Sequence, residues 1–412
     1  MNIELFLARR LYSTRKGKRR ISRPAVTIAQ WGVSIGTIVM FISICIIVGF
    51  KHQVRDKVAG FGGHIQIMSY EGSSDGATPI IADGRLTTEL LAINGIKHVQ
   101  SYAQIPGMIL AGSEYEGIML KGVGNEYDIS FFASNIVEGE IPHFTDNEAS
   151  DSIIISRYTA NKLNVRSGDK VNLYFMNNGI RARKMSVATI YETHLTEFDR
   201  NTAITDIYTT RRLNGWSNRE ATGIEIIVND FEQKESCRDS ILPIAEKAGQ
   251  RNYEGLCIPT INELYPSIFN WLDVLDQTVW IILILVICIA GFTTVSGLFI
   301  LILEKSNFIG ITKAIGANNR SIRKIFLYYA GFIVFKGMLI GNIIAAILCI
   351  IQQQTGIIAI DPEMYYMDRA PIEFSWLLIP MNIAMFIISV AILVIPSMLI
   401  SRIEPTKAIK FE

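Results

Sequence analysis

The sequence predicts a membrane protein with four transmembrane helices and a large extracytoplasmic α+β domain inserted between helices 1 and 2. Half of the 412 residues are hydrophobic and the mean hydropathy is +0.30, which is too apolar for an ordinary soluble enzyme. The apolar residues are concentrated in four long segments. A polar region of about 220 residues, large enough for one or two packed domains, separates the first segment from the second.

Each of the four apolar segments is long enough to cross a lipid bilayer. At 1.5 Å per residue the first segment is ~34 Å long, enough to span the hydrocarbon core. Lys336 is the one charged residue in the four segments, and we expect its ammonium group to reach the cytoplasmic membrane surface rather than to act as a buried functional charge. The predicted transmembrane helices are residues 28–50, 279–303 (271–303 with the stalk that precedes it), 325–351 and 374–400.

The distribution of lysine and arginine predicts that both termini are cytoplasmic. Residues 1–27, 304–324 and 401–412 are rich in basic residues, whereas residues 352–373 are mainly acidic. Because cytoplasmic connections are enriched in lysine and arginine, the three basic segments are expected inside the cell and residues 51–270 outside the cytoplasm, with residues 352–373 as a short loop on that same side. The net charge of +1 argues against nucleic acid as a partner.

The N-terminal segment is predicted to begin with a short amphipathic helix. Ile3, Phe6 and Leu7 share one helical face and Arg9 lies off it, a pattern typical of helices that lie on the membrane surface. We do not expect a cleavable signal peptide, because the first apolar segment is too long for the hydrophobic core of one.

The polar region, residues 51–270, is predicted to contain two parts. Its two ends, about 64–124 and 220–261, each alternate strand, helix and strand, so we expect them to form one α+β part. The insert between them, about 125–219, is expected to be mostly β. Apolar residues at helical spacing over residues 262–276 predict that the second transmembrane helix extends outward as a stalk. The strands expected in the insert are residues 153–155, 170–175 and 185–191.

The connection between the second and third apolar segments is longer than a simple turn requires and has its own apolar pattern. Phe308, Ile311 and Ile315 form one stripe of a short helix, and Gly316 is placed to end it because glycine tolerates the left-handed conformation. Gly310 would leave a flat spot where the backbone of another protein can approach closely. The pattern leaves two alternatives open, which are an apolar edge that binds a partner and a helix that lies in the lipid interface.

Two glycine pairs predict close helix packing within the membrane. Gly32 and Gly36 form a Gly-x-x-x-Gly pattern in the first segment, and Gly337 and Gly341 form another in the third. Such pairs let two helix backbones approach closely. The sequence leaves open whether these contacts lie within one subunit or across a dimer.

The motifs of several enzyme classes are absent from the sequence. It contains no P-loop, no Gly-x-Ser-x-Gly nucleophile elbow and no His-Glu-x-x-His zinc motif, so we expect a non-catalytic chain that binds no metal and no cofactor. Cys237 and Cys257 are the two cysteines of the polar region, and an oxidising compartment would allow them to form a disulfide.

Four stretches of the sequence resemble permeases of the FtsX-like superfamily, and within it the lipoprotein-releasing ABC transporter permeases. They correspond to the N-terminal surface helix of those permeases, the first span and the entry to the outer domain, the stalk, and the coupling helix. The sequence departs from the pattern at Ser306-Asn307-Phe308, where these permeases usually have a charged pair. The matching stretches are residues 4–10, 32–36 with 49–51 and 64–67, 272–276, and 304–305 with 309–317.

This resemblance implies a non-catalytic subunit of an ABC transporter in the bacterial inner membrane. Two permease subunits, identical or different, would pair there, and separate cytoplasmic ATPase subunits would bind ATP. The outer domains would pass a triacylated lipoprotein to a periplasmic carrier by mechanotransmission, without a solute path through the membrane. The residues implied to contact the ATPase are Glu304, Phe308, Ile309, Gly310, Ile311, Lys313, Ile315 and Gly316.

The sequence leaves three alternatives to lipoprotein release. A related permease could export other cargo with an outer-membrane partner, and an FtsX-like regulator could activate a cell-wall hydrolase through its outer domain. The large polar region counts against the regulator, since regulators of that type usually have a smaller outer domain. A receptor that senses a ligand outside would need a cytoplasmic signalling domain.

Overall fold

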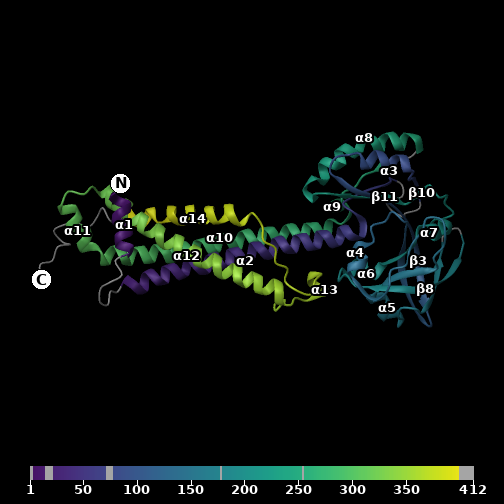
Figure 1. The fold of residues 1–412 in the computed structure, drawn as a ribbon, viewed down its shortest axis with the longest axis horizontal. Helices are drawn as coiled ribbons and strands as arrows, with labels where there is room; N and C mark the ends of the chain where they lie inside the picture. Colours follow the sequence, from purple (N-terminus) through teal and green to yellow (C-terminus); the bar gives the residue numbers. More distant parts are fainter. Residues whose placement is uncertain (1–2, 14–21, 71–77, 177–178, 253–254, 399–412) are drawn as a thin grey trace. The chain divides into compact units, whose positions relative to one another are not determined.

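The computed structural model describes residues 3–13, 22–70, 78–176, 179–252 and 255–398. The chain divides into two compact units, which we call the helical unit and the sheet unit (Figure 1). The helical unit comprises Met1–Lys51, Trp271–Ala359 and Arg369–Glu412, and the sheet unit comprises His52–Asn270 and Ile360–Asp368.

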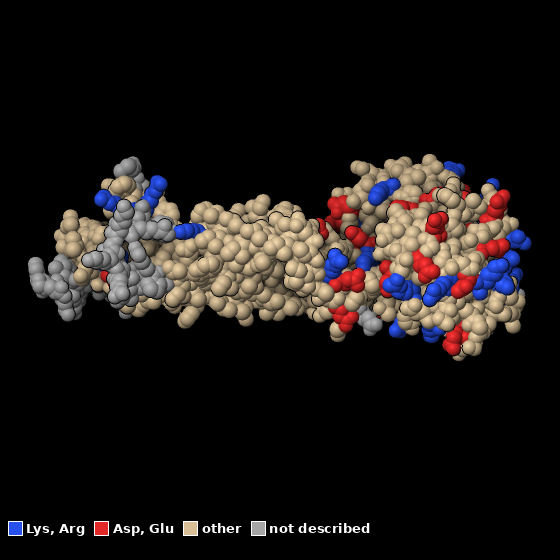
Figure 2. Space-filling view, turned by 60° about the horizontal axis from the view of Figure 1, so that its bottom comes forward, with Lys and Arg blue, Asp and Glu red and all other residues tan. Residues whose placement is uncertain are grey.

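Within the described residues, four helices are long and apolar enough to cross a membrane, as the sequence predicts. They are formed by α2 (Ser22–Gly62), α10 (Pro266–Glu304), α12 (Asn319–Thr355), and α14 (Leu378–Ile392) with α15 (Val394–Ser397). The long helices show almost no charged side chains on the face seen in Figure 2, whereas lysine, arginine, aspartate and glutamate cover the sheet unit. Apolar surface of this kind is what lipid solvates.

The helices differ from the predicted spans mainly at their ends. Hydropathy detects only the apolar part, whereas α2 continues with polar residues to Gly62. The fourth helix begins at Leu378 rather than at residue 374, and residues 399–400 of its predicted span lie outside the described residues. The predicted stalk is wrong at its start. Residues 261–264 form the separate helix α9 (Ile261–Leu264), and α10 begins at Pro266, because proline suits the first helical position but cannot continue a preceding helix.

Both predicted glycine pairs lie at contacts within the chain. A Cβ atom at Gly32 would lie 2.6 Å from Thr293 Oγ1 of α10, and one at Gly341 would lie 2.7 Å from the Ser34 carbonyl oxygen of α2. The Ser34 hydroxyl also donates a hydrogen bond of 2.8 Å to the carbonyl oxygen of Gly337. Helix α2 therefore packs against α10 through its own glycines and against α12 through the glycines of α12.

The sheet unit is an α+β domain built on one ten-stranded sheet. The strand order is β12-β1-β11-β3-β4-β9-β6-β8-β5, and β7 pairs with β3 and β8. A separate two-stranded sheet pairs β2 with β10. The strands are β1 (Ile65–Ser69), β2 (Ile80–Ile81), β3 (Ile96–Ala111), β4 (Glu114–Val123), β5 (Ile136–Gly139), β6 (Ser152–Ser156), β7 (Lys170–Phe175), β8 (Arg181–Tyr191), β9 (Thr202–Asp206), β10 (Glu220–Ala221), β11 (Gly223–Val228) and β12 (Leu256–Cys257).

The region of the predicted insert joins the main sheet instead of forming a sheet of its own. Strand β9 pairs parallel with β4, and β7 pairs antiparallel with β3. This region also contains four helices that the expectation of a mostly β insert missed, since each is too short to show a clear helical period. They are α4 (Ser130–Ser134), α5 (Arg157–Leu163), α6 (Thr196–Asn201) and α7 (Ile207–Asn214).

The long β3–β4 hairpin contributes to two separate hydrophobic cores. One core contains Val99 together with residues of α3 (Gly84–Leu91) and α8 (Lys234–Asn252). The other contains Ile105 and Ile109, farther along β3, and the strands of the insert. The disulfide that the sequence left open is not formed, because Cys237 and Cys257 are both free thiols, and Cys237 is buried in the first core.

The contact between α2 and α12 predicts that a larger side chain at Gly341 destabilises the helical unit. Gly341→Val should lower the free energy of unfolding by about 1–3 kcal/mol, because the new side chain meets the backbone of α2, which cannot rotate away. The melting temperature of the full chain in detergent would measure this. Gly331→Val is the matched control, since a Cβ atom at Gly331 meets nothing within 4 Å. Equal melting temperatures for the two variants would contradict the packing account.

Candidate functional site

The connection between α10 and α12 contains a short helix, α11 (Ser306–Ala314), with well-defined ends. It ends as the sequence predicts, at Gly316, which has a φ of +98°. The amide of Gly316 donates to the carbonyl of Lys313 and the amide of Ala317 to that of Thr312. This pair of hydrogen bonds is the Schellman motif, in which a left-handed residue, usually glycine, closes the helix. The Asn318 side chain then caps the start of α12.

One face of α11 is buried by the chain itself. Ile309 is fully buried and shares a hydrophobic core with Ile322 and Phe326 at the start of α12. Gly310 is also buried, so the expectation that it offers a flat spot to a partner is wrong. The side chain that packs inward is Ile309, which lies between the stripe residues and was not part of the predicted pattern.

The opposite face of α11 exposes apolar side chains. Ile311 is 51% exposed and Ile315, directly after the helix, is 82% exposed. Asn307 is exposed one turn before Ile311, so these three residues follow one side of the helix. Phe308, the first residue of the predicted stripe, is only half-buried and lies between the two faces. The arrangement can therefore present isoleucine side chains to another protein or to lipid.

The connection begins with an ion pair and carries a further lysine in the last turn of α11. Glu304, the last residue of α10, forms an ion pair with Lys305, with 3.3 Å between Oε1 and Nζ. Desolvation and the nearby Arg323 guanidinium lower the pKa of Lys313. Among the described residues of the whole chain, no group of three His, Cys, Asp or Glu side chains is placed to hold a metal ion.

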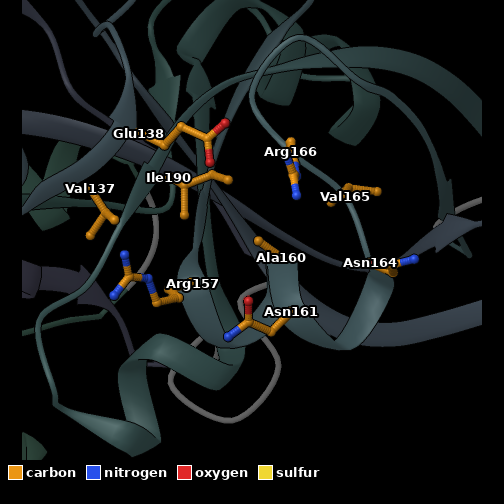
Figure 3. A pocket seen from close by; sticks show the side chains of 9 residues that line it. All are labelled: Val137, Glu138, Arg157, Ala160, Asn161, Asn164, Val165, Arg166 and Ile190. Carbon is orange, nitrogen blue, oxygen red and sulfur yellow. The ribbon is translucent and has the colours of Figure 1, made fainter.

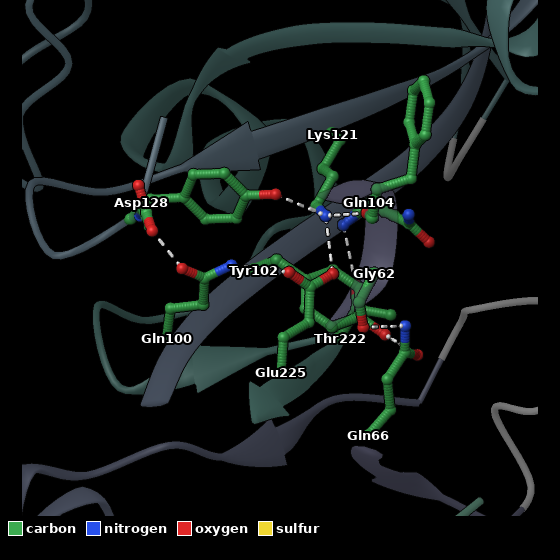
Figure 4. A network of polar contacts seen from close by, with 11 residues as sticks. Gly62, Gln66, Gln100, Tyr102, Gln104, Lys121, Asp128, Thr222 and Glu225 are labelled. Carbon is green, nitrogen blue, oxygen red and sulfur yellow. Dashed lines mark hydrogen bonds and ion pairs between the residues drawn. The ribbon is translucent and has the colours of Figure 1, made fainter. Parts of the chain in front are cut away.

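A second candidate site is the buried ion pair where α2 ends in the sheet unit (Figure 4). Lys121 of β4 donates hydrogen bonds to the Phe61 carbonyl oxygen (2.6 Å), to the Tyr127 hydroxyl (2.9 Å) and to Glu225 Oε1 of β11 (2.5 Å). Gln100 of β3 donates to the other carboxylate oxygen of Glu225. The side chains of Lys121 and Glu225 are 2% and 1% exposed. The network thus joins the last turn of α2 to three strands.

The electrostatics of this pair depend on its partners. Burial lowers the pKa of Lys121, and the Glu225 carboxylate opposes that shift. Burial and the same carboxylate hold the pKa of Tyr127 well above its ordinary value, so its hydroxyl stays neutral. A charged group in a protein interior is tolerated only when it is paired and hydrogen-bonded, as it is here.

The sequence analysis missed this ion pair, although a signal for it exists. Lys121 follows Ile118-Met119-Leu120, and Glu225 stands between Ile224 and Ile226, so each is a charge within an apolar stretch of its strand. Because apolar stretches of this kind are buried, two opposite charges within them can be expected to meet.

Aromatic contacts fix the start of α10 in the same unit. Tyr265, the residue before α10, contacts Phe198 of α6, with ring centroids 4.9 Å apart. Phe269 in the first turn of α10 stacks on Phe231, with centroids 6.1 Å apart. Such pairs add to the free energy of burying the rings.

Two contacts within the helical unit also join α2 to α10. Phe50 and Trp271 meet with ring centroids 5.4 Å apart, and Lys51 forms an ion pair with Asp276. These two helices are therefore connected to each other near the ends of their apolar parts.

A hollow of about 380 Å³ lies between β5 and α5 (Figure 3). The buried side chains of Ala160 and Ile190 line it, together with two arginines. One of these, Arg157, is paired with Glu192 at 2.7 Å, and Glu138, also at the hollow, accepts a hydrogen bond from the Ser167 amide. Because positive and negative groups balance, the hollow favours neither an anionic nor a cationic ligand.

Comparison with known proteins gave matches to two family models. A model described as MacB-like periplasmic core domain matches residues 27–244, which is just over half of the chain. A model described as FtsX-like permease C-terminal matches residues 280–405.

Individual proteins are similar over nearly the whole length at low identity. The chain is 21% identical to lipoprotein-releasing system transmembrane protein LolE of Haemophilus influenzae, over 99% of each chain. It is 20% identical to LolC of Neisseria meningitidis, over 92% of each chain. A solved structure of the periplasmic region of MacB from Actinobacillus actinomycetemcomitans is 12% identical, with a TM-score of 0.35, and the match covers 52% of this chain and 96% of that one.

The buried pair predicts a large loss of stability when one partner is removed. Lys121→Met should lower the free energy of unfolding by about 3–5 kcal/mol, because it leaves the Glu225 carboxylate buried without its cation. Denaturant unfolding of the full chain in detergent, followed by circular dichroism, would measure it. The double variant Lys121→Met/Glu225→Gln should lose less free energy of unfolding than the single variant, since no charge is left unpaired. A double variant that is less stable than the single variant would show that the unpaired charge is not the cause.

Proposed function

The chain belongs to the FtsX-like family of ABC transporter permeases, has a MacB-like periplasmic core domain and is a bacterial inner-membrane protein, and we propose that it transmits ATP-driven movement from the cytoplasm to the periplasm to release lipoproteins. The observation that carries the proposal is the short helix α11, which lies between two membrane helices and exposes Ile311 and Ile315. In this proposal an ATPase subunit binds that exposed face.

The proposed orientation places both termini and α11 in the cytoplasm. Its support is the basic composition of residues 1–27, 304–324 and 401–412 beside the acidic composition of residues 352–373. The sheet unit would then face the periplasm, and the ATPase would meet α11 from the cytoplasmic side.

The proposed movement passes along helices. Helix α10 runs from Pro266 to Glu304 without a break, and α11 follows after the single non-helical residue Lys305. A displacement of α11 would therefore act on the end of α10, whose other end holds Phe269 on Phe231 in the sheet unit. In an unbroken helix every interior amide is hydrogen-bonded along the axis, so the helix resists bending and can carry the displacement.

The contact residues in this proposal differ from those implied by the family resemblance. Ile311 and Ile315 would contact the ATPase directly, and Lys313 would border the contact. Ile309 and Gly310 would hold α11 on α12, because both are buried by the chain itself. Gly316 would set the end of the helix, and Glu304 with Lys305 would set its start. Phe308 would pack at the edge of the contact.

The proposed cargo is a lipoprotein with a lipid anchor. Its support is the similarity to two lipoprotein-releasing system transmembrane proteins over nearly the full length. The composition of the spans also supports cargo that does not pass through the membrane as a solute, since Lys336 is the one charged residue within the predicted spans. Release from the outer leaflet to a periplasmic carrier would need no aqueous path.

The proposal predicts that acidic substitutions on the exposed face of α11 abolish ATPase binding. Ile311→Asp/Ile315→Asp should lower the amount of ABC ATPase subunit that co-purifies in mild detergent by at least about tenfold, because buried apolar anchors carry most of the energy of an interface. Quantitative mass spectrometry of the purified complex measures this loss. Ile357→Asp is the matched control, since Ile357 is 73% exposed but follows α12 at its other end.

Equal co-purification of the ATPase with the double variant and with Ile357→Asp would refute the proposed contact. The same preparation tests the cargo separately. Triacylated protein should accompany the wild-type complex, and a complex that contains the ATPase but never acylated protein would refute lipoprotein release while leaving the permease assignment intact.

A further inference from the structure

The segment between α12 and α14 belongs partly to the helical unit and partly to the sheet unit. Its middle part, Ile360–Asp368, belongs to the sheet unit, whereas the residues on both sides of it belong to the helical unit. This middle part contains α13 (Pro362–Tyr365) and the buried side chain of Met367. Neither family model's description nor the proposed function gives this segment a role.

Lys57 holds the middle part to the sheet unit. Its ammonium group donates one hydrogen bond to the Tyr366 carbonyl oxygen and one to the Thr193 carbonyl oxygen, each 2.7 Å long. Thr193 is itself fixed, because its hydroxyl donates to the buried carboxylate of Asp199 at 2.7 Å. A single cation on α2 therefore joins the segment to the loop that follows β8.

A second contact lies beside the lysine. His194 Nε2 and Asp368 Oδ2 are 3.2 Å apart. His194 and Tyr366 both have left-handed backbones, with φ of +63° and +59°. Residues other than glycine adopt this conformation uncommonly. The loop after β8 and the segment each place such a residue at their contact.

The base of the segment is held to α12 by one side chain. Gln352 donates to the carbonyl oxygens of Ile358 and Ala370 and accepts a hydrogen bond from the Ile358 amide. Ala359 and Arg369 pair as an antiparallel bridge next to this contact, and the Ile360 amide donates to the Asp368 carbonyl. The segment is thus a hydrogen-bonded ribbon, fixed at its base to α12 and at its tip to Lys57.

We propose that residues 358–370 are a second mechanical attachment, by which α12 acts on the sheet unit independently of α10, through Lys57 in the part of α2 that belongs to that unit and through the loop after β8. The function of this attachment rests on the proposed mechanotransmission, but its existence does not. Lys57 is a positioning residue, because it fixes the tip of the ribbon and touches neither ATPase nor cargo in this proposal. Movement of α12, which follows α11 after residues 315–318, would reach the sheet unit through Gln352, the ribbon and Lys57.

Hydrogen exchange of the full chain in detergent tests the attachment. Lys57→Met keeps the length and apolar stem of the side chain but removes its donors, so amides of residues 360–368 should exchange faster by about tenfold or more, since hydrogen bonds from a charged donor are among the stronger ones. Exchange in α3 and α8 should not change. Lys247→Ala is the control, because Lys247 is an exposed lysine of α8. Unchanged exchange of residues 360–368 in Lys57→Met would overturn the attachment.

If Lys57→Met increases exchange throughout the sheet unit, Asp368→Ala is the deciding variant, since it removes the side-chain contact to His194 and leaves both hydrogen-bond partners of Lys57 in place. Faster exchange confined to residues 360–368 in that variant supports the attachment, and unchanged exchange overturns it. In a reconstituted complex, Lys57→Met should bind the ATPase normally but release at least about threefold less acylated protein per ATP hydrolysed. Equal release would overturn the mechanical role, whereas a wild-type complex that releases none would count against the proposed cargo alone.

Discussion

Helix continuity is the constraint on which the rest of this structure depends. In hydrocarbon backbone amides and carbonyls must be satisfied within the protein, which favours unbroken helices, and α2, α10 and α12 each cross as one helix, whereas the fourth consists of α14 and α15 on either side of Leu393. Helices α2 and α10 extend this condition beyond the apolar residues, to Gly62 and from Pro266. The same hydrogen bonds that make a helix soluble in lipid also make it stiff. A permease whose outer domain moves while no solute crosses the membrane needs stiff helices.

Side-chain contacts attach the ends of the stiff helices α2 and α10 to the rest of the sheet unit. Lys121 binds the Phe61 carbonyl at the end of α2, and this contact is buried together with Glu225, so it cannot be exchanged for water without a large cost in free energy. Phe231 holds Phe269 at the start of α10. The small residues Gly32, Ser34 and Gly341 let the helices pack closely in the membrane. The chain combines apolar surface for lipid, close packing between helices and buried polar contacts at their ends.

Much of this architecture could be predicted from the sequence, because its signals are local. Four apolar segments, the alternating strands of β7 and β8, and the end of α11 at Gly316 depend on short-range periodicity and on one glycine. The orientation of α11 could not be predicted, since the choice between Ile309 and Ile311 as the buried side chain depends on where α12 lies. The helical break at Tyr265 and the joining of the insert to the main sheet likewise depend on tertiary contacts. The Lys121–Glu225 pair could have been inferred from charges in apolar strands, but its partner Phe61 could not.

The proposed function requires that α11 and the sheet unit lie on opposite sides of the membrane. The most direct measurement replaces the five native cysteines and introduces one at Ile315, which is 82% exposed, or at Met176, which is 77% exposed. A membrane-impermeant maleimide is then added to spheroplasts before or after permeabilisation. The account predicts that the Met176→Cys variant is labelled in intact spheroplasts and that the Ile315→Cys variant is labelled only after permeabilisation. Labelling of both variants in intact spheroplasts would contradict it.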